Sequence, residues 1–205
     1  MYITKIKLNK NLRDVTNPIN IHSNIELGLK RSENKNVPSG RILWRLEDHG
    51  IETHLLVVTP AEPDFKHING ESITKEYSKL IESVEEGKQY LFKVKANTVR
   101  CSKGVDGSMT SRGKVMGITD YIKQKEWFIE KSKSYGFKVD NSSFDIITAE
   151  QEVFIKRTGE KVTIMTADIE GVLTISDVNI FRNTLTHGFG RAKAYGCGLI
   201  TIMRA

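Results

Sequence analysis

The stretch HGFGRAKAYGCG occupies residues 187–198, and the apolar run LITIM follows it at residues 199–203. Glycines allow backbone conformations that other residues avoid and let a bulky ligand approach the main chain. Arg191 and Lys193 add positive charge, and no carboxylate follows Asp177. We therefore predict an anion-binding loop that leads into a final strand. The predicted binding positions are Gly188, Gly190, Gly196 and Gly198, together with the two cations. The alternative is a helix C-cap at Gly188 and a glycine-rich turn.

Composition favours an acidic partner. The 205 residues include 31 Lys and Arg against 25 Asp and Glu, which gives a formal charge of +6 and favours binding of a polyanion. Cys101 and Cys197 stand far apart, without a C-x-x-C motif or histidines at metal-ligand spacing, so we expect neither a zinc site nor a disulfide. Residues 1–8 lack the apolar core of a signal peptide, and no apolar run approaches membrane-spanning length. We expect a cytoplasmic protein that binds no membrane and uses no metal or other cofactor.

The first half of the sequence predicts a strand, a helix and a hairpin, in this order. Polar and apolar residues alternate over residues 2–8, and apolar residues recur at helical spacing over residues 17–31. Residues 41–47 and 52–59 have the composition of two strands joined by a turn. The pattern of residues 72–80 is ambiguous, and we interpret it as a short helix followed by an edge strand.

The second half repeats this order of elements. The predicted elements are a strand at 88–97, a basic glycine-containing loop at 100–114, a helix at 119–136, a hairpin of strands 143–156 and 161–175, a helix that begins after Asp177, and the final strand. Both halves therefore follow the order strand, helix, strand, strand, helix, strand. This order predicts an α+β fold of two tandem ferredoxin-like (RRM-like, βαββαβ) domains with antiparallel sheets, at residues 1–82 and 88–205.

Four motifs carry a resemblance to a known family. They are MYITKI at residues 1–6, FKVKANTVR at 92–100, EGVLTI at 170–175 and GFGRAKAYGCGL at 188–199. In this order they resemble the CasE family of the RAMP superfamily, the endoribonucleases that process repeat RNA in type I-E Cascade CRISPR complexes. The resemblance implies tandem ferredoxin-like domains that bind the stem-loop of CRISPR repeat RNA. It also implies metal-independent cleavage of precursor crRNA, once per repeat, by an enzyme that stays bound as a Cascade subunit beside other Cascade subunits.

The resemblance also implies a catalytic residue, His22, because the family has its catalytic histidine near the start of the first helix. Cleavage through the RNA's own 2′-hydroxyl needs one proton removed and another supplied, and a histidine can serve either step. A tyrosine commonly stands three residues earlier in the family, whereas this sequence has Ile19. The sequence also has Asn97-Thr98 where the family usually has Asn-Pro. The alternative for His22 is a surface or capping role, and His187 beside the glycine loop is the rival catalytic candidate.

Basic residues elsewhere are candidates for RNA binding. We expect Lys30 and Arg31, farther along the first helix, to neutralise the scissile phosphate, and Lys95 and Arg100 to face the RNA. The predicted hairpin tip carries Lys156, Arg157 and Lys161, which we expect to enter a groove of the RNA. The second function that we consider is a non-catalytic RNA-binding or architectural ferredoxin-like protein, and His22 is the feature that separates the two.

Overall fold

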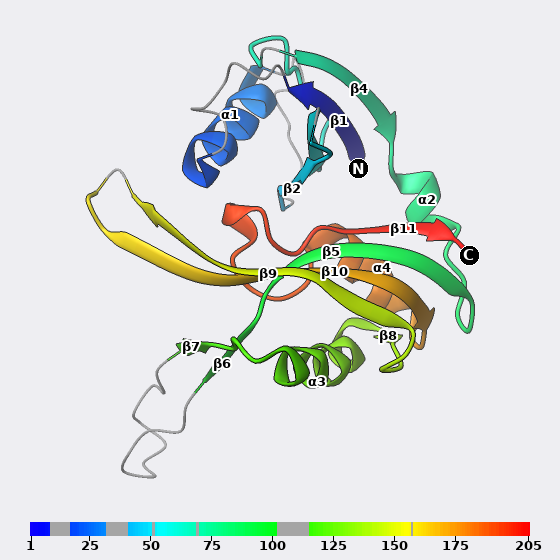
Figure 1. Cartoon of the computed structure of the whole chain (residues 1–205). Helices are drawn as coiled ribbons and strands as arrows, with labels where there is room; N and C mark the ends of the chain where they lie inside the picture. The colour runs from blue at the N-terminus through cyan, green and yellow to red at the C-terminus, as the bar shows by residue number, and fades with distance from the viewer. Residues whose placement is uncertain (9–16, 32–40, 51, 69, 102–114, 157) are drawn as a thin grey trace, which may run out of the picture.

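Two antiparallel sheets form the framework of the protein in a computed structural model, with the first sheet above the second in the view of Figure 1. The structure describes residues 1–8, 17–31, 41–50, 52–68, 70–101, 115–156 and 158–205, and of Lys30 and Arg31 it describes the backbone alone. The elements of the first half are β1 (Tyr2–Leu8), α1 (Pro18–Arg31), β2 (Leu43–Asp48), β3 (Thr53–Thr59), β4 (Gly70–Glu76) and α2 (Ser78–Glu82). Those of the second half are β5 (Gln89–Asn97), β6 (Val99–Cys101), β7 (Val115–Gly117), α3 (Tyr121–Ser132), η2 (Lys133–Tyr135), β8 (Phe137–Lys138), β9 (Phe144–Ile155), β10 (Lys161–Ile175), α4 (Val178–His187), η3 (Lys193–Tyr195) and β11 (Ile200–Arg204).

The first sheet has the strand order β2-β3-β1-β4, with every neighbouring pair antiparallel. The fourth, first, third and second strands of this half thus lie side by side, as in a ferredoxin-like sheet. Helix α1 presents Ile21 and Ile25 to Ile6 and Leu55, which face the same side of the central strands. Burial of these apolar side chains holds the helix on the sheet. The strands and helix predicted at residues 2–8, 17–31, 41–47 and 52–59 are confirmed.

The prediction of a helix and then a strand over residues 72–80 is wrong, because the strand comes first. β4 pairs with β1 along its whole length, from Gly70 opposite Leu8 to Glu76 opposite Tyr2. Such long-range pairing decides whether an ambiguous segment becomes a strand, and local composition does not reveal it. The short helix α2 follows the strand.

No helix lies between β3 and β4 in the described residues 60–68, so the first half departs from the predicted order of elements. This connection contains two prolines, which disfavour helix, and it packs directly on α1. Phe65 and Ile68 are buried in the core under α1, and Asp64 donates its backbone N–H to the carbonyl of Gly28 at 3.1 Å. A Cβ at Gly28 would lie 2.5 Å from the ring of Phe65, so the absence of a side chain there permits this close packing.

The second sheet has the order β11-β5-β10-β8, and β9 also pairs with β10. Of the four strands predicted for this half, the final (β11), first (β5), third (β10) and second (β9) are adjacent in this order, as in the first sheet. The hairpin predicted at residues 143–156 and 161–175 is confirmed by β9 and β10. The core beneath α3 and α4 is aromatic, with Phe92, Phe128, Phe137, Phe181 and Phe189 in one cluster. The end of the first half joins this cluster through Tyr77, Ile81 and Val84.

A buried arginine connects the two sheets. Arg45 in β2 is only 1% exposed, and its Nη1 donates to the carbonyl oxygens of Lys93 in β5 and Leu199 before β11, both at 2.8 Å. Its Nη2 donates to Thr201 and to the carboxylate of Glu47. Burial raises the pKa of Glu47, but the hydrogen bond and charge of Arg45 outweigh it and hold this pKa below its ordinary value. The paired charge fixes the first sheet against the strand that follows the glycine loop.

Candidate functional site

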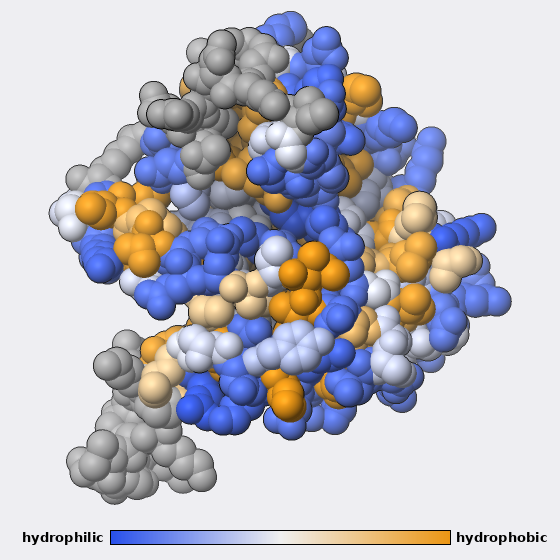
Figure 2. Space-filling model, in the orientation of Figure 1, coloured by the Kyte–Doolittle hydropathy of each residue, from blue (hydrophilic) through white to orange (hydrophobic). Residues whose placement is uncertain are grey.

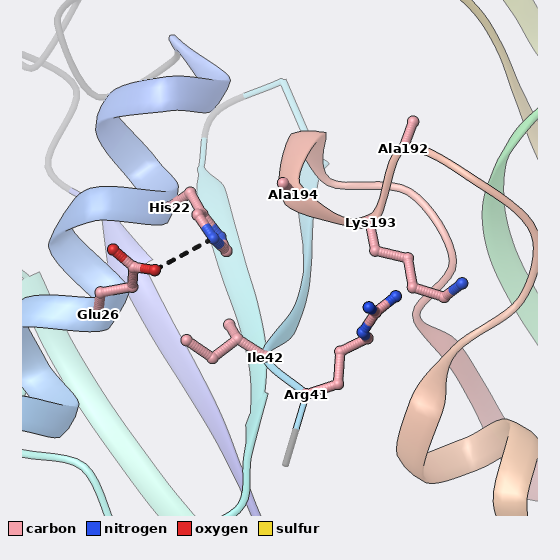
Figure 3. A pocket seen from close by; sticks show the side chains of 7 residues that line it. All are labelled: His22, Glu26, Arg41, Ile42, Ala192, Lys193 and Ala194. Atoms are coloured by element: carbon pink, nitrogen blue, oxygen red, sulfur yellow. Dashed lines mark ion pairs between the residues drawn. The ribbon is translucent and has the colours of Figure 1, made fainter. Parts of the chain in front are cut away.

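The glycine loop and the first helix meet at a pocket of about 460 Å³. Its walls come from α1, from the residues that lead into β2, and from the part of the loop around η3, as Figure 3 shows. The lining residues are His22, Glu26, Arg41, Ile42, Ala192, Lys193 and Ala194. The structure therefore brings together two of the predicted residues, His22 and Lys193, which are far apart in the sequence.

His22 lies on the second turn of α1 with its imidazole partly exposed. Its Nε2 is 3.6 Å from Oε1 of Glu26, one helical turn farther along, and Figure 3 marks this pair. Its Nδ1 is buried and has no hydrogen-bond partner among the described residues. The carboxylate of Glu26 is therefore the acidic group that lies beside the imidazole in this pocket. Glu26 has no signal in the sequence beyond its spacing of four residues from His22.

Two cations stand across the pocket from the histidine. Figure 3 shows the side chains of Arg41 and Lys193 with their nitrogen-bearing ends near each other. The Nζ of Lys193 donates to the carbonyl of Gly190. Burial and then the charge of Arg41 lower the pKa of Lys193. Arg41 was not predicted from the sequence, because it stands alone before a strand and belongs to no motif. Two cations beside a titratable histidine provide a binding place for a phosphate.

The glycine loop owes its shape to its glycines and its charge to its side chains. Gly188 is the C-cap of α4 and donates to the carbonyl of Thr184 at 2.8 Å, so the capping alternative is correct for this residue. Gly196 has φ +85°, and a Cβ there would lie 2.7 Å from the ring of Trp44. Gly198 has φ +89°, and its backbone N–H donates to the carbonyl of Lys95 at 2.7 Å. The N–H groups of Gly188, Gly190 and Gly198 donate to acceptors inside the protein, so anion attraction at these positions depends on Arg191 and Lys193.

Ile19 lies in an apolar environment. It packs against a small cluster formed by Phe154, Ile164 and Cys197, together with Tyr195. The ring of Tyr195 lies 4.7 Å from that of Phe154, which places it in packing. The position three residues before His22 therefore contributes hydrophobic contact between α1 and the hairpin and no polar group to the pocket.

Among the residues whose side chains the structure describes, none of the other predicted basic residues lines this pocket. Lys95 is largely buried, and its Nζ lies 2.6 Å from Oε1 of Glu152. Burial is the strongest influence on the pKa of Lys95 and lowers it. The hydrogen bond and the charge of Glu152 outweigh burial, so the pKa is raised. Lys156 pairs with Glu160 at 2.8 Å across the hairpin turn. Lys161 and Arg100 are exposed. Arg157 and residues 102–114 of the predicted basic loop lie outside the described residues, as do the side chains of Lys30 and Arg31.

The β9–β10 hairpin is less polar than its basic tip suggests. Val153 and Ile155 are exposed on β9, and Figure 2 shows apolar residues grouped on the hairpin, at the left of the view. The hairpin therefore offers both cations and apolar contact.

His187, the rival candidate, is exposed at the end of α4. Its Nδ1 lies 2.8 Å from Oγ1 of Thr186 and 3.2 Å from the carbonyl of Asn183. It does not line the pocket that holds His22. His187 is therefore a helix C-terminal residue in this structure.

Neither a metal-ligand cluster nor a membrane-spanning helix occurs in the described part of the chain. No three His, Cys, Asp or Glu side chains in those residues come close enough together to hold a metal ion. The described helices are all too short or too polar to cross a membrane.

Comparisons with known proteins agree on one family. A family model described as "CRISPR associated protein" matches residues 1–204. The CRISPR-associated endoribonuclease Cse3 of Thermus thermophilus is 24% identical over 98% of this chain and 99% of its own length. A structure of CRISPR endoribonuclease Cse3 bound to RNA superposes with a TM-score of 0.82 at 22% identity, covering 99% of this chain and 100% of that one. A chain of a CRISPR RNA-guided surveillance complex gives a TM-score of 0.69 at 18% identity, with 100% of both chains covered.

Proposed function

Because this chain belongs to the CRISPR-associated protein family, we propose that it is an endoribonuclease that binds the stem-loop of CRISPR repeat RNA and cleaves the precursor once per repeat. The observation that carries the proposal is the pocket in which His22 faces Arg41 and Lys193. The similarity along its whole length to the endoribonuclease Cse3 supports the same activity. We further propose that it acts in the cytoplasm as a Cascade subunit that keeps its product, and the similarity to a chain of a surveillance complex supports the role within a complex.

The proposed chemistry is attack by the RNA's own 2′-hydroxyl on the adjacent phosphorus. This forms the 2′–O–P bond of a 2′,3′-cyclic phosphate and breaks the bond from phosphorus to the 5′-oxygen. The 2′-hydroxyl gives up a proton, and the departing 5′-oxygen takes one. His22 carries one of these proton transfers, a contribution typically of about two to four powers of ten in rate.

The charge that develops on the phosphate needs compensation, and two side chains in the pocket can supply it. Arg41 presents a planar fork of donors suited to phosphate oxygens, and Lys193 adds a point charge. Because these groups provide both proton transfer and charge stabilisation, the reaction we propose is metal-independent. Glu26 acts as a positioning residue, since its carboxylate lies 3.6 Å from Nε2 of the histidine.

The remaining basic residues are proposed to bind the RNA outside the cleavage point. Arg191 of the glycine loop holds the backbone near the scissile phosphate, and Lys161 extends the basic surface along the hairpin. Lys95 and Lys156 bind RNA only by exchanging their carboxylate partners for phosphate, because both are paired in this structure. We therefore rank their contribution below that of the glycine loop.

The proposal is tested with a CRISPR-repeat stem-loop and the same RNA with a 2′-deoxy sugar at the junction. We expect cleavage of the first RNA and intact binding without cleavage of the second. His187→Ala is the matched control for His22→Ala, because it removes an exposed histidine outside the pocket. Tight binding of the first RNA without cleavage would favour the non-catalytic RNA-binding function, and cleavage of the deoxy RNA would exclude attack by the 2′-hydroxyl.

A further inference from the structure

A second pocket, of about 270 Å³, adjoins the glycine loop at Gly190 and Arg191, directly before the residues that line the His22 pocket. Consecutive residues of one loop therefore contribute to two neighbouring pockets. The other lining residues that matter for the argument are Cys101 from β6, Trp127 and Lys131 from α3, and Tyr135 from η2. The mechanism proposed above uses none of them except Arg191.

An aromatic wall gives this pocket its shape. The ring of Tyr135 lies 4.5 Å from that of Phe189, and Trp127 meets Phe189 edge-on at 5.9 Å and 87°. The hydroxyl oxygen of Tyr135 accepts a hydrogen bond from the N–H of Gly190 at 3.0 Å, which ties the wall to the loop. Both Trp127 and Tyr135 are only partly buried. Fixed aromatic surface of this kind is a platform on which a nucleobase of any identity can stack.

The charge of the pocket suits a phosphate. Lys131 and Arg191 are exposed cations that line it, and no carboxylate belongs to its described lining. Nη2 of Arg191 lies 4.0 Å from Sγ of Cys101, so the guanidinium reaches from the loop to β6. An aromatic wall with two cations at its edge matches the two parts of a nucleotide, a flat base and an anionic phosphate.

We propose that this pocket binds one unpaired ribonucleotide that flanks the stem-loop, with its base against Trp127 and its phosphate beside Arg191 and Lys131. The inference rests on the proposed function and adds a specificity element to it. The pocket is too small for a duplex and adjoins the cleavage pocket through the loop, so its occupant is the single-stranded residue where the stem ends. The protein therefore reads the junction between duplex and single strand as well as the stem.

Cys101 provides a direct readout, because it lines this pocket and is exposed, whereas Cys197 is completely buried. Burial raises the pKa of Cys197 to about 12, and a buried neutral thiol resists alkylation, so Cys197 is the internal control. Three stem-loop RNAs are compared, each with a 2′-deoxy sugar at the junction so that it is not cleaved. One has no flanking nucleotides, one has an unpaired 5′ flank and one has an unpaired 3′ flank. N-ethylmaleimide labelling of Cys101 in the full chain is measured in the presence of each.

We expect one of the two flanked RNAs to protect Cys101 from N-ethylmaleimide. The same RNA should bind about tenfold more tightly than the RNA without flanks. Lys131→Gln should reduce this gain and lower the salt slope of binding to the flanked RNA by about one. Lys133→Gln, which removes a nearby lysine outside the pocket, should leave the gain unchanged. If all three RNAs bind equally and Cys101 stays reactive with each, the nucleotide pocket is wrong while the proposed function stands. If no stem-loop binds, the proposed function fails first.

Discussion

Arg45 donates a hydrogen bond of 2.8 Å from Nη1 to the carbonyl oxygen of Leu199, although the two residues are 154 positions apart in the sequence. Leu199 directly follows the last glycine of the loop, and Arg45 lies in the sheet that carries α1. The contact therefore fixes the loop relative to the helix that bears His22. The position of the proposed catalytic pocket depends on a buried charged side chain outside it.

Replacement of Arg45 should destabilise the protein strongly. The side chain of Glu47 is only 13% exposed in the intact protein, and Arg45→Ala removes its partner. Removing one partner of a buried ion pair costs about 3–5 kcal/mol of folding stability. Urea unfolding followed by circular dichroism measures this loss. Lys79→Ala, which breaks an exposed pair with Glu76, should change stability by less than about 1 kcal/mol. Equal effects of the two substitutions would show that Arg45 does not hold the sheets together.

Glu26→Gln should slow cleavage while leaving the KM for RNA nearly unchanged. The amide keeps the size of the side chain but loses the charge that holds the imidazole of His22, so we expect kcat to fall about tenfold, within the range known for residues that position a catalytic group. Because the enzyme keeps its product, single-turnover kinetics with enzyme in excess measure both quantities, as the cleavage rate at saturation and the enzyme concentration that gives half of that rate. Glu126→Gln, on the exposed surface of α3, is the matched control. A rise in KM at constant kcat would assign Glu26 to binding instead.

The pH dependence of RNA binding should reflect Lys193. Burial and the charge of Arg41 lower its pKa, so as pH rises Lys193 loses its proton earlier than an ordinary lysine with a pKa of 10.5. As pH rises, affinity for the stem-loop should therefore begin to decrease before the pH reaches the pKa of an ordinary lysine. Arg41→Gln removes the neighbouring charge and so raises the pKa of Lys193. The decrease in affinity should then occur at higher pH, although binding at neutral pH is weaker. Titration of the dissociation constant between neutral and alkaline pH tests the direction, and an unchanged or opposite movement would contradict it.

Two glycines of the loop should differ in their tolerance of alanine. Both Gly190 and Gly196 have positive φ, a conformation that costs an alanine about 1–2 kcal/mol. A Cβ at Gly190 meets nothing within 4 Å, whereas at Gly196 it would lie 2.7 Å from the ring of Trp44. Gly196→Ala should therefore lower the free energy of unfolding by clearly more than Gly190→Ala. Similar losses in denaturant titrations would mean that the loop moves away from the indole ring at little cost.

Local periodicity was sufficient to predict most of the elements. The hairpin of β9 and β10 could be located because alternation and a glycine-containing turn are properties of neighbouring residues. The order of β4 and α2 could not, since it depends on pairing with β1, whose residues are distant in the sequence. The connection before β4 differs, because its two prolines are visible in the sequence, whereas its packing on α1 beside Gly28 is not.

The site was predictable only in part. His22 and Lys193 could be selected because each belongs to a recognisable motif or family position. Arg41 belongs to none, and it joins the pocket only because β2 begins beside the loop. Lys95 and Lys156 are indistinguishable from RNA-binding lysines in the sequence, yet each is paired with a carboxylate in the folded chain. The pair of Lys95 and Glu152 joins strands that are distant in the sequence and depends on their arrangement in the sheet, which the composition of one segment does not contain.

The most direct test of the account is single-turnover cleavage of a CRISPR-repeat stem-loop in EDTA by the wild type and by His22→Ala, with identification of the new RNA ends. The account predicts a 2′,3′-cyclic phosphate and a 5′-hydroxyl from the wild type, and a rate at least about a hundredfold lower for His22→Ala, with hairpin affinity retained. Cleavage that stops in EDTA, leaves a 5′-phosphate, or persists at the wild-type rate without His22 would contradict it.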